Sequence, residues 1–222
     1  MEHNKFKKIG FIFGLKREME LVLNKNNNIY YVYGYGKSSK DATQKLISYG
    51  VNFVINFGFA GSISKKLKNG DIVFIDKIFN EKKKKLLTLK FDKDLLRNFG
   101  INFKFYKCNL LTVQEVAMGK REKLNLAKKF KSISLIDMEA FHIKEELLKE
   151  NIPMISLKVI FDDLSFNIPS YLKNCITDTG DLRTKKFLIQ LCLNPTRIFE
   201  LLKLNTKFSK SKKVLRYLIN SL

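Results

Sequence analysis

Short apolar runs alternate with amphipathic stretches along most of the chain. A run of about four to eight apolar residues that ends at a glycine or a polar turn is typical of a buried strand, whereas an apolar residue every three or four positions is typical of a helix. Strands are therefore predicted over residues 8–13, 29–33, 51–57, 72–78, 86–91, 103–106, 133–136 and 154–160. Helices are predicted over residues 17–24, 38–49, 120–130, 139–150, 182–192, 196–204 and 209–220. This alternation indicates a mostly parallel sheet covered by helices.

Length and composition fit one soluble domain. The sequence has 222 residues without a repeat or a Pro/Ser-rich linker, so residues 1–222 are expected to form a single domain. A hydrophobic fraction of 45% excludes a disordered chain, and no apolar run reaches the ~18 residues of a membrane span. The N-terminus lacks a secretory signal and the three cysteines are widely spaced. A reduced, cytoplasmic protein without disulfides or a metal site is expected.

The net charge of +21 comes from 42 Lys and Arg against 21 Asp and Glu. Only six of the basic residues are Arg, the residue that most often reads base edges, so no nucleic acid partner is expected. Residues 201–222 hold six basic and no acidic residues, interspersed with apolar ones, which predicts a basic amphipathic helix. Such a helix suits an anionic membrane surface, and it equally fits a last helix packed on the domain with a solvated lysine face.

Acidic residues and glycines gather where predicted strands end. Glu18 follows the first strand, and residues 58–61, 137–139 and 162–163 follow three others. Open α/β sheets bind ligands at the carboxyl edge of their strands, where glycine amides can approach a sugar or a phosphate. Three acidic positions at one edge suit chemistry that develops positive charge. Taken singly, each signal equally fits a turn, a helix cap or an exposed acid.

Four motifs in the right order resemble the purine nucleoside phosphorylase and nucleosidase superfamily. They are KIGFIFG at 8–14 with Glu18 after it, VINFGFAGS at 54–62 with LKNGDIV at 67–73, IDMEA at 136–140, and PMISLKVIFD at 153–162. The resemblance covers roughly the whole chain. It implies a three-layer α/β/α fold with a mixed, largely parallel central sheet and a helical C-terminal extension, and a homo-oligomer.

Within that superfamily the chain most resembles the hopanoid-associated phosphorylases, which act on adenosylhopane. This narrower resemblance depends on the motif FGFAG at 57–61 and on the short N-terminal half. It also depends on a helical tail that contains Ile168-Pro169, Gly180-Asp181 and Asn194-Pro195. It implies a lipid-linked purine nucleoside as substrate.

The resemblance also implies a role for each site residue. The family breaks the N-glycosidic bond between purine and ribose, and Asp162 matches the acid that protonates or hydrogen-bonds purine N7. Glu139 would bind the ribose hydroxyls with Met138 packed against the sugar, and Glu18 matches the carboxylate that orients water in hydrolytic members. The other implied substrate-binding residues are Gly58, Phe59, Ala60, Gly61 and Phe161. No cofactor is implied, apart from inorganic phosphate as a co-substrate of phosphorolysis.

Departures from the family pattern leave phosphorolysis and hydrolysis both open. The family's phosphate-site arginine matches Asn56 and its phosphate-binding serine matches Phe59, so a bidentate donor and a hydroxyl are missing. Gly14, Arg17 and Lys37 are the candidates for a replacement phosphate site.

Two further departures lie on the last predicted strand. Lys158 replaces a family arginine, which predicts a looser ion pair. Phe161 stands where relatives have a small residue, which predicts a reshaped base pocket.

Three functions are consistent with these motifs. The first is release of adenine from a lipid-linked nucleoside such as adenosylhopane, with residues 201–222 in peripheral contact with the inner membrane surface. The second is a nucleosidase for methylthioadenosine or adenosylhomocysteine. The third is a non-catalytic basic protein that binds membrane or nucleic acid on a degenerate phosphorylase scaffold. Free-base release, measured with and without phosphate, separates them.

Overall fold

The computed structural model describes residues 8–22, 28–80, 82–89, 104–115, 119–164, 169–175, 177, 183–194 and 196–221. The strands are β1 (Ile9–Phe13), β2 (Ile29–Tyr33), β3 (Phe53–Ser62), β4 (Ile72–Asn80), β5 (Lys85–Thr88), β6 (Tyr106–Thr112), β7 (Leu135–Asp137) and β8 (Met154–Asp162). The helices are α1 (Lys16–Met19), α2 (Ser39–Ser48), α4 (Lys120–Lys129), α5 (Ala140–Lys149), α6 (Thr184–Leu193) and α7 (Arg197–Asn220). Two 3₁₀ turns, η1 (Gly36–Ser38) and η2 (Ser170–Cys175), complete the elements.

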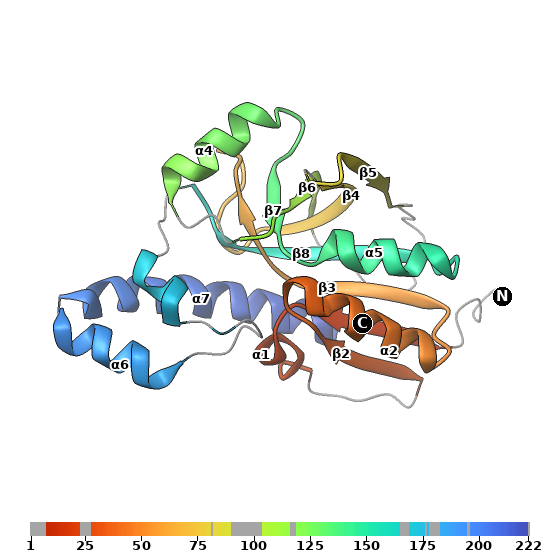
Figure 1. Ribbon diagram of the computed structural model, residues 1–222, viewed down its shortest axis with the longest axis horizontal. Coiled ribbons are helices and arrows are strands. Elements are labelled where there is room, and N and C mark those ends of the chain that lie inside the picture. Colours follow the sequence, from red (N-terminus) through yellow and green to blue (C-terminus); the bar gives the residue numbers. More distant parts are fainter. Residues whose placement is uncertain are drawn as a thin grey trace.

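The sheet is mixed, and part of it closes on itself. Strands β2, β1, β3 and β8 are parallel neighbours. Strand β4 runs antiparallel to β8 and parallel to β6, and β6 pairs with β7, whose antiparallel contact with β3 completes a ring of five strands. The predicted mixed, largely parallel sheet with helices is confirmed (Figure 1). The ring was not predicted, because it depends on pairings between strands that are distant in sequence.

Several predicted bounds are wrong. Gly58 and Gly61 were expected to lie beyond the end of the third strand, but β3 continues through both, since β8 pairs with them. The strand expected over 103–106 lies instead at Tyr106–Thr112, where pairing with β4 outweighs the polar side chains of that stretch. Helices expected over 196–204 and 209–220 form one helix, α7. The helix expected over 17–24 is the single turn α1; residues 23, 24, 90 and 91 lie outside the described residues.

Helices cover both faces of the sheet. Helices α2 and α5 pack side by side on one face, where Leu46, Phe141 and Leu147 are fully buried (Figure 1). The other face is covered by α1 and by the C-terminal half of α7, which buries Leu215 and Leu218 among strand phenylalanines. Helix α4 covers a smaller apolar cluster beside strands β6 and β7. The helices therefore form the outer layers of a three-layer α/β/α arrangement.

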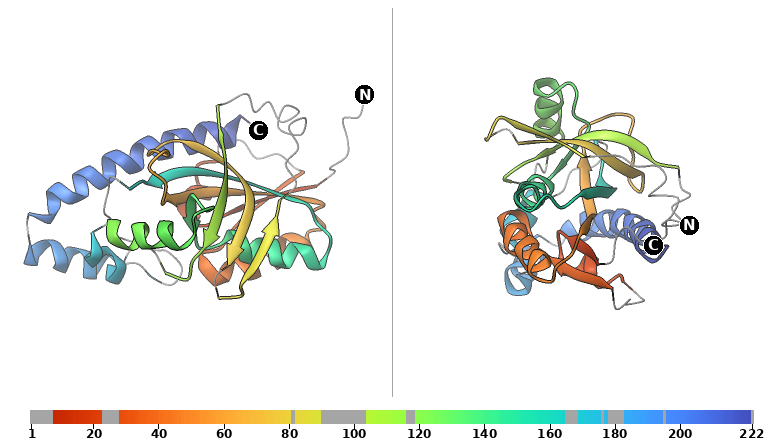
Figure 2. Two further views of the ribbon diagram at one scale, coloured as in Figure 1. Left: turned by 90° about the horizontal axis from the view of Figure 1, so that it is seen from above. Right: turned by 90° about the vertical axis from the view of Figure 1, so that its right-hand side faces the viewer.

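Helix α7 has two different halves. Its second half packs on the sheet through Ser211, Leu215, Leu218 and Ile219, all buried, so the apolar side of residues 209–220 faces the domain. The first half extends beyond the sheet beside α6, as Figure 2 shows from above. Within the part of the chain that the structure describes, no helix is long and apolar enough to cross a membrane.

Candidate active site

Glu18 is buried at the carboxyl end of β1. The single turn of α1 follows the strand and directs this side chain inward, so that only 3% of the residue is exposed. Its two carboxylate oxygens accept hydrogen bonds from the backbone N–H groups of Leu15 and Phe59, both at 2.9 Å. Burial raises the pKa of Glu18, although both hydrogen bonds lower it. Glu18 is thus hydrogen-bonded, through the backbone N–H of Phe59, to the glycine-containing strand β3.

The close contact between Glu18 and β3 depends on Gly58. Its φ of +149° lies in a region that L side chains rarely adopt, and a methyl group there would lie 3.1 Å from the Glu18 Oε2 atom. A glycine at this position therefore lets the backbone approach the carboxylate.

Glu139 lies between the end of β7 and the start of α5, beside Glu18. It accepts hydrogen bonds from the backbone N–H groups of Gly36, at 3.2 Å, and Met138, at 3.3 Å. A methyl group on Gly14 would lie 3.3 Å from the Glu139 Oε2 atom and 3.4 Å from the Glu18 Oε2 atom, so the two carboxylates flank Gly14. Burial, reinforced by the charge of Asp137, raises the pKa of Glu139 to about 8. The end of β1 is thus a site where two buried acids face each other.

Lys158 supplies positive charge to this acidic cluster. Its Nζ atom lies 3.2 Å from the Asp137 Oδ2 atom, and both side chains are 1% exposed. The ammonium also lowers the pKa of Glu18 and of Glu139, which opposes the effect of burial. The family arginine is therefore replaced here by a lysine that still forms a buried ion pair.

Asp162, the predicted acid, ends β8 four residues beyond Lys158, about 13 Å along an extended strand. Its Oδ1 atom lies 2.5 Å from the Nζ atom of Lys123 on α4, a residue with no exposed surface. Burial raises the pKa of Asp162 to about 6, while the ammonium of Lys123 lowers it. A carboxyl group with a pKa near neutrality can both donate and recover a proton at working pH, as general acid catalysis requires.

The neighbouring Asp163 ties β8 to helix α7. Its Oδ2 atom accepts a hydrogen bond from the backbone N–H of Asn69 at 3.0 Å and lies 3.3 Å from the Lys207 Nζ atom. The Asn69 side chain in turn donates to the carbonyl of Phe161 at 2.7 Å and to the Ser211 hydroxyl at 2.8 Å. The carboxyl end of β8 is therefore held between α4 and α7.

The predicted substrate-binding residues fall into two groups. Met138 lies against the η1 loop, 3.8 Å from a methyl group placed on Gly36, and adjoins Glu139. Phe59 and Phe161 instead pack on each other, with ring centroids 5.9 Å apart, and both contact Phe208 of α7. Ala60 is buried and Gly61 pairs with Asp162 across the strands. Phe208 had no sequence signal beyond its place in the predicted tail.

Of the predicted phosphate-binding residues, only Gly14 lies within the site. It is buried between the two carboxylates, whereas Arg17 and Lys37 are exposed. Asn56, which replaces the family's arginine, is fully buried and cross-links three strands: its amide donates to the Ile12 carbonyl at 3.2 Å and it accepts from the Ser156 hydroxyl at 2.9 Å. Asn56 therefore links β3 to its two neighbours in the sheet.

Lys123 was missed at the sequence level, although a signal was present. In the predicted helix 120–130, Lys123 lies on the same helical stripe as Leu126, Ala127 and Phe130, at spacings of three, four and seven residues. These three pack on the cluster under α4. A lysine on an apolar stripe indicates a buried charge with an acidic partner.

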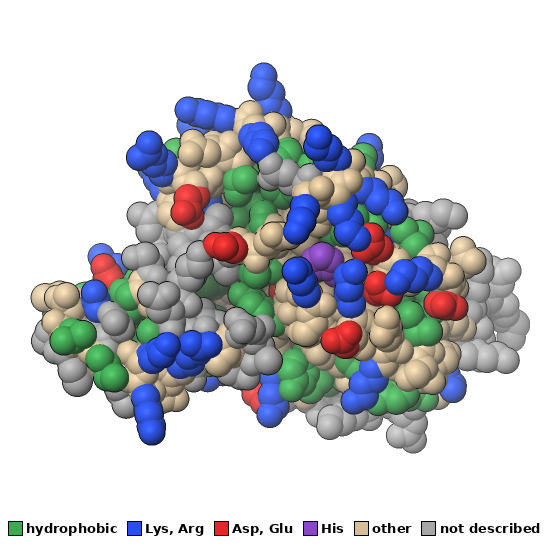
Figure 3. All heavy atoms as spheres, viewed as in Figure 1, with side chains coloured by type: hydrophobic (Ala, Val, Ile, Leu, Met, Phe, Trp, Pro, Cys, Tyr) green, Lys and Arg blue, Asp and Glu red, His purple; other side chains and the backbone are tan. Residues whose placement is uncertain are grey.

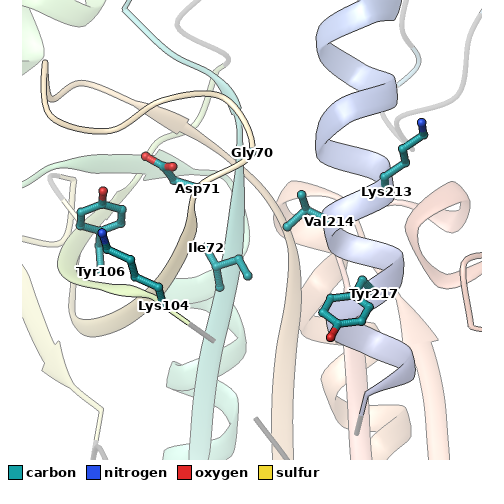
Figure 4. A pocket seen from close by; sticks show the side chains of 8 residues that line it. All are labelled: Gly70, Asp71, Ile72, Lys104, Tyr106, Lys213, Val214 and Tyr217. Atoms are coloured by element: carbon teal, nitrogen blue, oxygen red, sulfur yellow. The ribbon is translucent and has the colours of Figure 1, made fainter. Parts of the chain in front are cut away.

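A separate surface groove lies elsewhere on the molecule. A groove of about 580 Å³ lies between β4 and the start of β6 on one side and α7 on the other, and Figure 4 shows the side chains that line it. It is lined by Gly70, Asp71, Ile72, Lys104, Tyr106, Lys213, Val214 and Tyr217. None of the carboxylates described above lines it, so we do not assign the chemistry to this groove.

Comparison with known proteins gives the family. Residues 17–164 match the model of the phosphorylase superfamily. The chain is 30% identical, over 88% of its length and 84% of the relative's, to a 5′-methylthioadenosine/S-adenosylhomocysteine nucleosidase of Buchnera aphidicola subsp. Baizongia pistaciae. The Helicobacter pylori nucleosidase of the same name has the same fold, with a TM-score of 0.61 and 18% identity over 72% of this chain and 86% of that one. A futalosine hydrolase mutant of that species has a TM-score of 0.59 and 19% identity over 69% and 89% of the two chains.

The protein belongs to the phosphorylase superfamily. It is an enzyme of the N-ribosyl hydrolase or nucleoside phosphorylase class. The superfamily resemblance of the four motifs is thereby confirmed.

Proposed function

We propose that the protein hydrolyses the N-glycosidic bond of an adenine nucleoside substituted at the 5′ position, of the methylthioadenosine or adenosylhomocysteine type. Two nucleosidases of that description from Buchnera aphidicola are 30% and 28% identical to the chain, and this supports the second of the three functions above over adenosylhopane. The observation that carries hydrolysis is the position of Glu18 against the amide of Phe59.

In this mechanism each carboxyl group has its own task. Asp162 donates its proton to purine N7 while the bond between C1′ and N9 breaks and its electron pair moves into the base. Glu139 binds the ribose hydroxyls, and Glu18 orients a water molecule and accepts its proton as the oxygen bonds to C1′. The carboxylate of Glu18 would also stabilise the positive charge that develops on the ribose.

The same geometry argues against phosphorolysis. A phosphate at this site would need the β3 amide that Glu18 already occupies, and it would lie beside two buried carboxylates. Placing a doubly charged anion there is unfavourable, since like charges at short distance repel strongly in a buried site. Asn56 offers no replacement, because both ends of its amide bond to the sheet.

Phosphate is expected to leave the rate unchanged. Adenine release from 5′-methylthioadenosine should agree within about twofold with and without phosphate, because water is the nucleophile. The Arg17→Ala and Lys37→Ala variants should retain the activity, since both side chains are exposed. The products should include free 5-methylthioribose and no sugar phosphate. A rate that rises in proportion to phosphate would overturn the hydrolytic assignment.

The substrate panel should include adenosylhopane, the lipid-linked nucleoside of the narrower resemblance. Higher kcat/KM for adenosylhopane than for methylthioadenosine and adenosylhomocysteine would favour the first function of the sequence analysis. Base release from none of the three would favour the non-catalytic function. The oligomeric state that the resemblance implies stays a prediction for analytical ultracentrifugation.

We also propose that any membrane contact is made by the α6–α7 corner, and not by the packed second half of α7. Leu193, Phe199 and Leu202 are 69%, 66% and 58% exposed, a level that is unusual for large apolar side chains grouped together. Helices α6 and α7 also carry the exposed basic residues Lys185, Lys186 and Lys203, together with the exposed acid Glu200. Apolar side chains on helices that carry an excess of cations complement an anionic lipid surface. Figure 3 shows exposed apolar side chains at this end of the molecule, on the left.

The variant carrying Phe199→Ser and Leu202→Ser is expected to lose sedimentation with phosphatidylglycerol-containing vesicles, while neutral phosphatidylcholine vesicles bind neither protein. Tyr217→Ser is the matched control, because Tyr217 is 63% exposed on the other half of α7. Equal binding to both vesicle types would contradict the proposal. So would a wild-type dimer that the double variant dissociates, since this surface would then bind a second copy.

A further inference from the structure

The carboxyl group of Asp162 is in contact with a buried cation, the ammonium group of Lys123. The Lys123 Nζ atom lies 2.5 Å from the Asp162 Oδ1 atom and donates to the backbone carbonyl of Asp163 at 3.2 Å. The lysine has no exposed surface, since its stem lies on the side of α4 that packs on the domain. A charge held in this way cannot be solvated by water, so its interaction with Asp162 is stronger than that of a surface pair.

Two further charged groups lie beside this pair. Asp163 at the end of β8 and Lys207 of α7 lie next to it, and Lys207 is 25% exposed while Lys123 is fully enclosed. Asp163 raises the pKa of Asp162, whereas Lys207 lowers it less than Lys123 does. Burial lowers the pKa of Lys123 itself, and both aspartates raise it. The cluster therefore holds two acids and two cations, of which Lys123 is the cation in direct contact with Asp162.

We propose that Lys123 is the positioning residue of the proposed reaction: it holds one carboxylate oxygen of Asp162 so that the other faces the leaving base, and its charge adjusts how readily Asp162 gives up its proton. The inference rests on the proposed function, because it assigns the general acid to Asp162.

The proton balance gives Lys123 an effect on the rate without a proton transfer of its own. When Asp162 protonates N7, it becomes a carboxylate, and the ammonium 2.5 Å away stabilises that product form. Glu18 meanwhile gains the proton of the attacking water and later returns it to solvent, from which Asp162 is reprotonated. No oxidant, reductant or further reactant is needed. Lys123 makes Asp162 a stronger acid and keeps it ready for use near neutral pH.

The test compares Lys123→Met, Lys123→Gln and Lys123→Arg with wild type by two independent measurements. The first is the ¹³C NMR titration of the Asp162 carboxyl, assigned with Asp162→Asn. The second is the pH profile of kcat/KM for adenine release. An opposite charge at this distance lowers the pKa of an aspartate by about 1–3 units, so Met and Gln should raise the NMR titration midpoint and the alkaline limb of the profile by about that amount. Arg keeps the charge and should leave both near their wild-type positions.

The control is Lys207→Met, which removes a positive charge from helix α7 beside the neighbouring Asp163 and should move the alkaline limb of the pH profile far less. If Lys123 had only a structural role, its substitution would lower kcat/KM at every pH without moving the alkaline limb of the profile. The proposal is overturned if the Asp162 titration in Lys123→Gln and Lys123→Met coincides with that of wild type. If wild type releases no base while the NMR titration still shifts, the proposed function fails and the coupling between Lys123 and Asp162 stands.

Discussion

Asp162→Asn is expected to lower kcat/KM for adenine release from 5′-methylthioadenosine by about 10²–10⁴-fold, the usual contribution of a general acid. The amide keeps the size of the side chain but has no proton to transfer to N7, so the base must leave as an anion. The folded state should persist, because Asn can still accept a hydrogen bond from the Lys123 ammonium. Steady-state assays of free adenine across pH 5–9 provide the measurement, and circular dichroism verifies the fold.

The matched control is Asp76→Asn. Asp76 is 28% exposed and lies 3.1 Å from Lys107 at the molecular surface, so its loss should change kcat/KM by about twofold at most. An undiminished rate in Asp162→Asn would remove the assignment of the acid and leave Glu139, with its pKa of about 8, as the remaining candidate.

Lys158→Met is expected to destabilise the protein by about 3–5 kcal/mol, because it leaves buried Asp137 without its cation. Glu18 and Glu139 lose the same favourable charge, so the folded-state pKa values of these two glutamates should rise. A raised folded-state pKa means that the folded protein binds protons more readily than the unfolded chain. The loss of unfolding free energy in Lys158→Met should therefore become smaller as pH falls from 8 towards the unfolded-state pKa values near 4. Urea unfolding of variant and wild type at pH 5 and pH 8 measures this difference.

Lys107→Met provides the comparison, since Lys107 forms a surface pair and is 50% exposed. A loss of about 1 kcal/mol or less is expected there, independent of the acidic cluster. Lys158→Arg keeps the charge and should recover most of the stability. Equal losses in Lys158→Met and Lys107→Met would show that the buried pair contributes no more than a surface pair.

The positions of the main acids could be predicted in part from local rules. Glu18 and Glu139 each follow a predicted strand, and open sheets bind ligands at the carboxyl ends of their strands. The strand before Glu139, β7, nevertheless runs antiparallel to β3, so a parallel arrangement does not explain why Glu139 lies beside Glu18. The structure places these two side chains on either side of Gly14. The assignment of Asp162 to a strand end could likewise be read from the apolar run before it.

What could not be predicted depends on contacts between distant elements. Gly58 after an apolar run predicts the end of a strand, since glycine weakens strands, but here the absence of a side chain makes room for the Glu18 carboxylate. Phe161 was expected to reshape a base pocket, and its observed contacts with Phe59 and Phe208 required knowing that α7 returns to this strand. The partner of Lys123 is 39 residues away on another element, a pairing that no local spacing reveals.

The attachment of α7 to β8 makes the order of a strand end depend on a helix that lies far away in sequence. Asn69, Asp163 and Lys207 connect a turn, the end of strand β8 and helix α7, so the end of β8 has its full set of contacts only when α7 is docked. A local unfolding event that undocks α7 would therefore also loosen the strand end that carries Asp162.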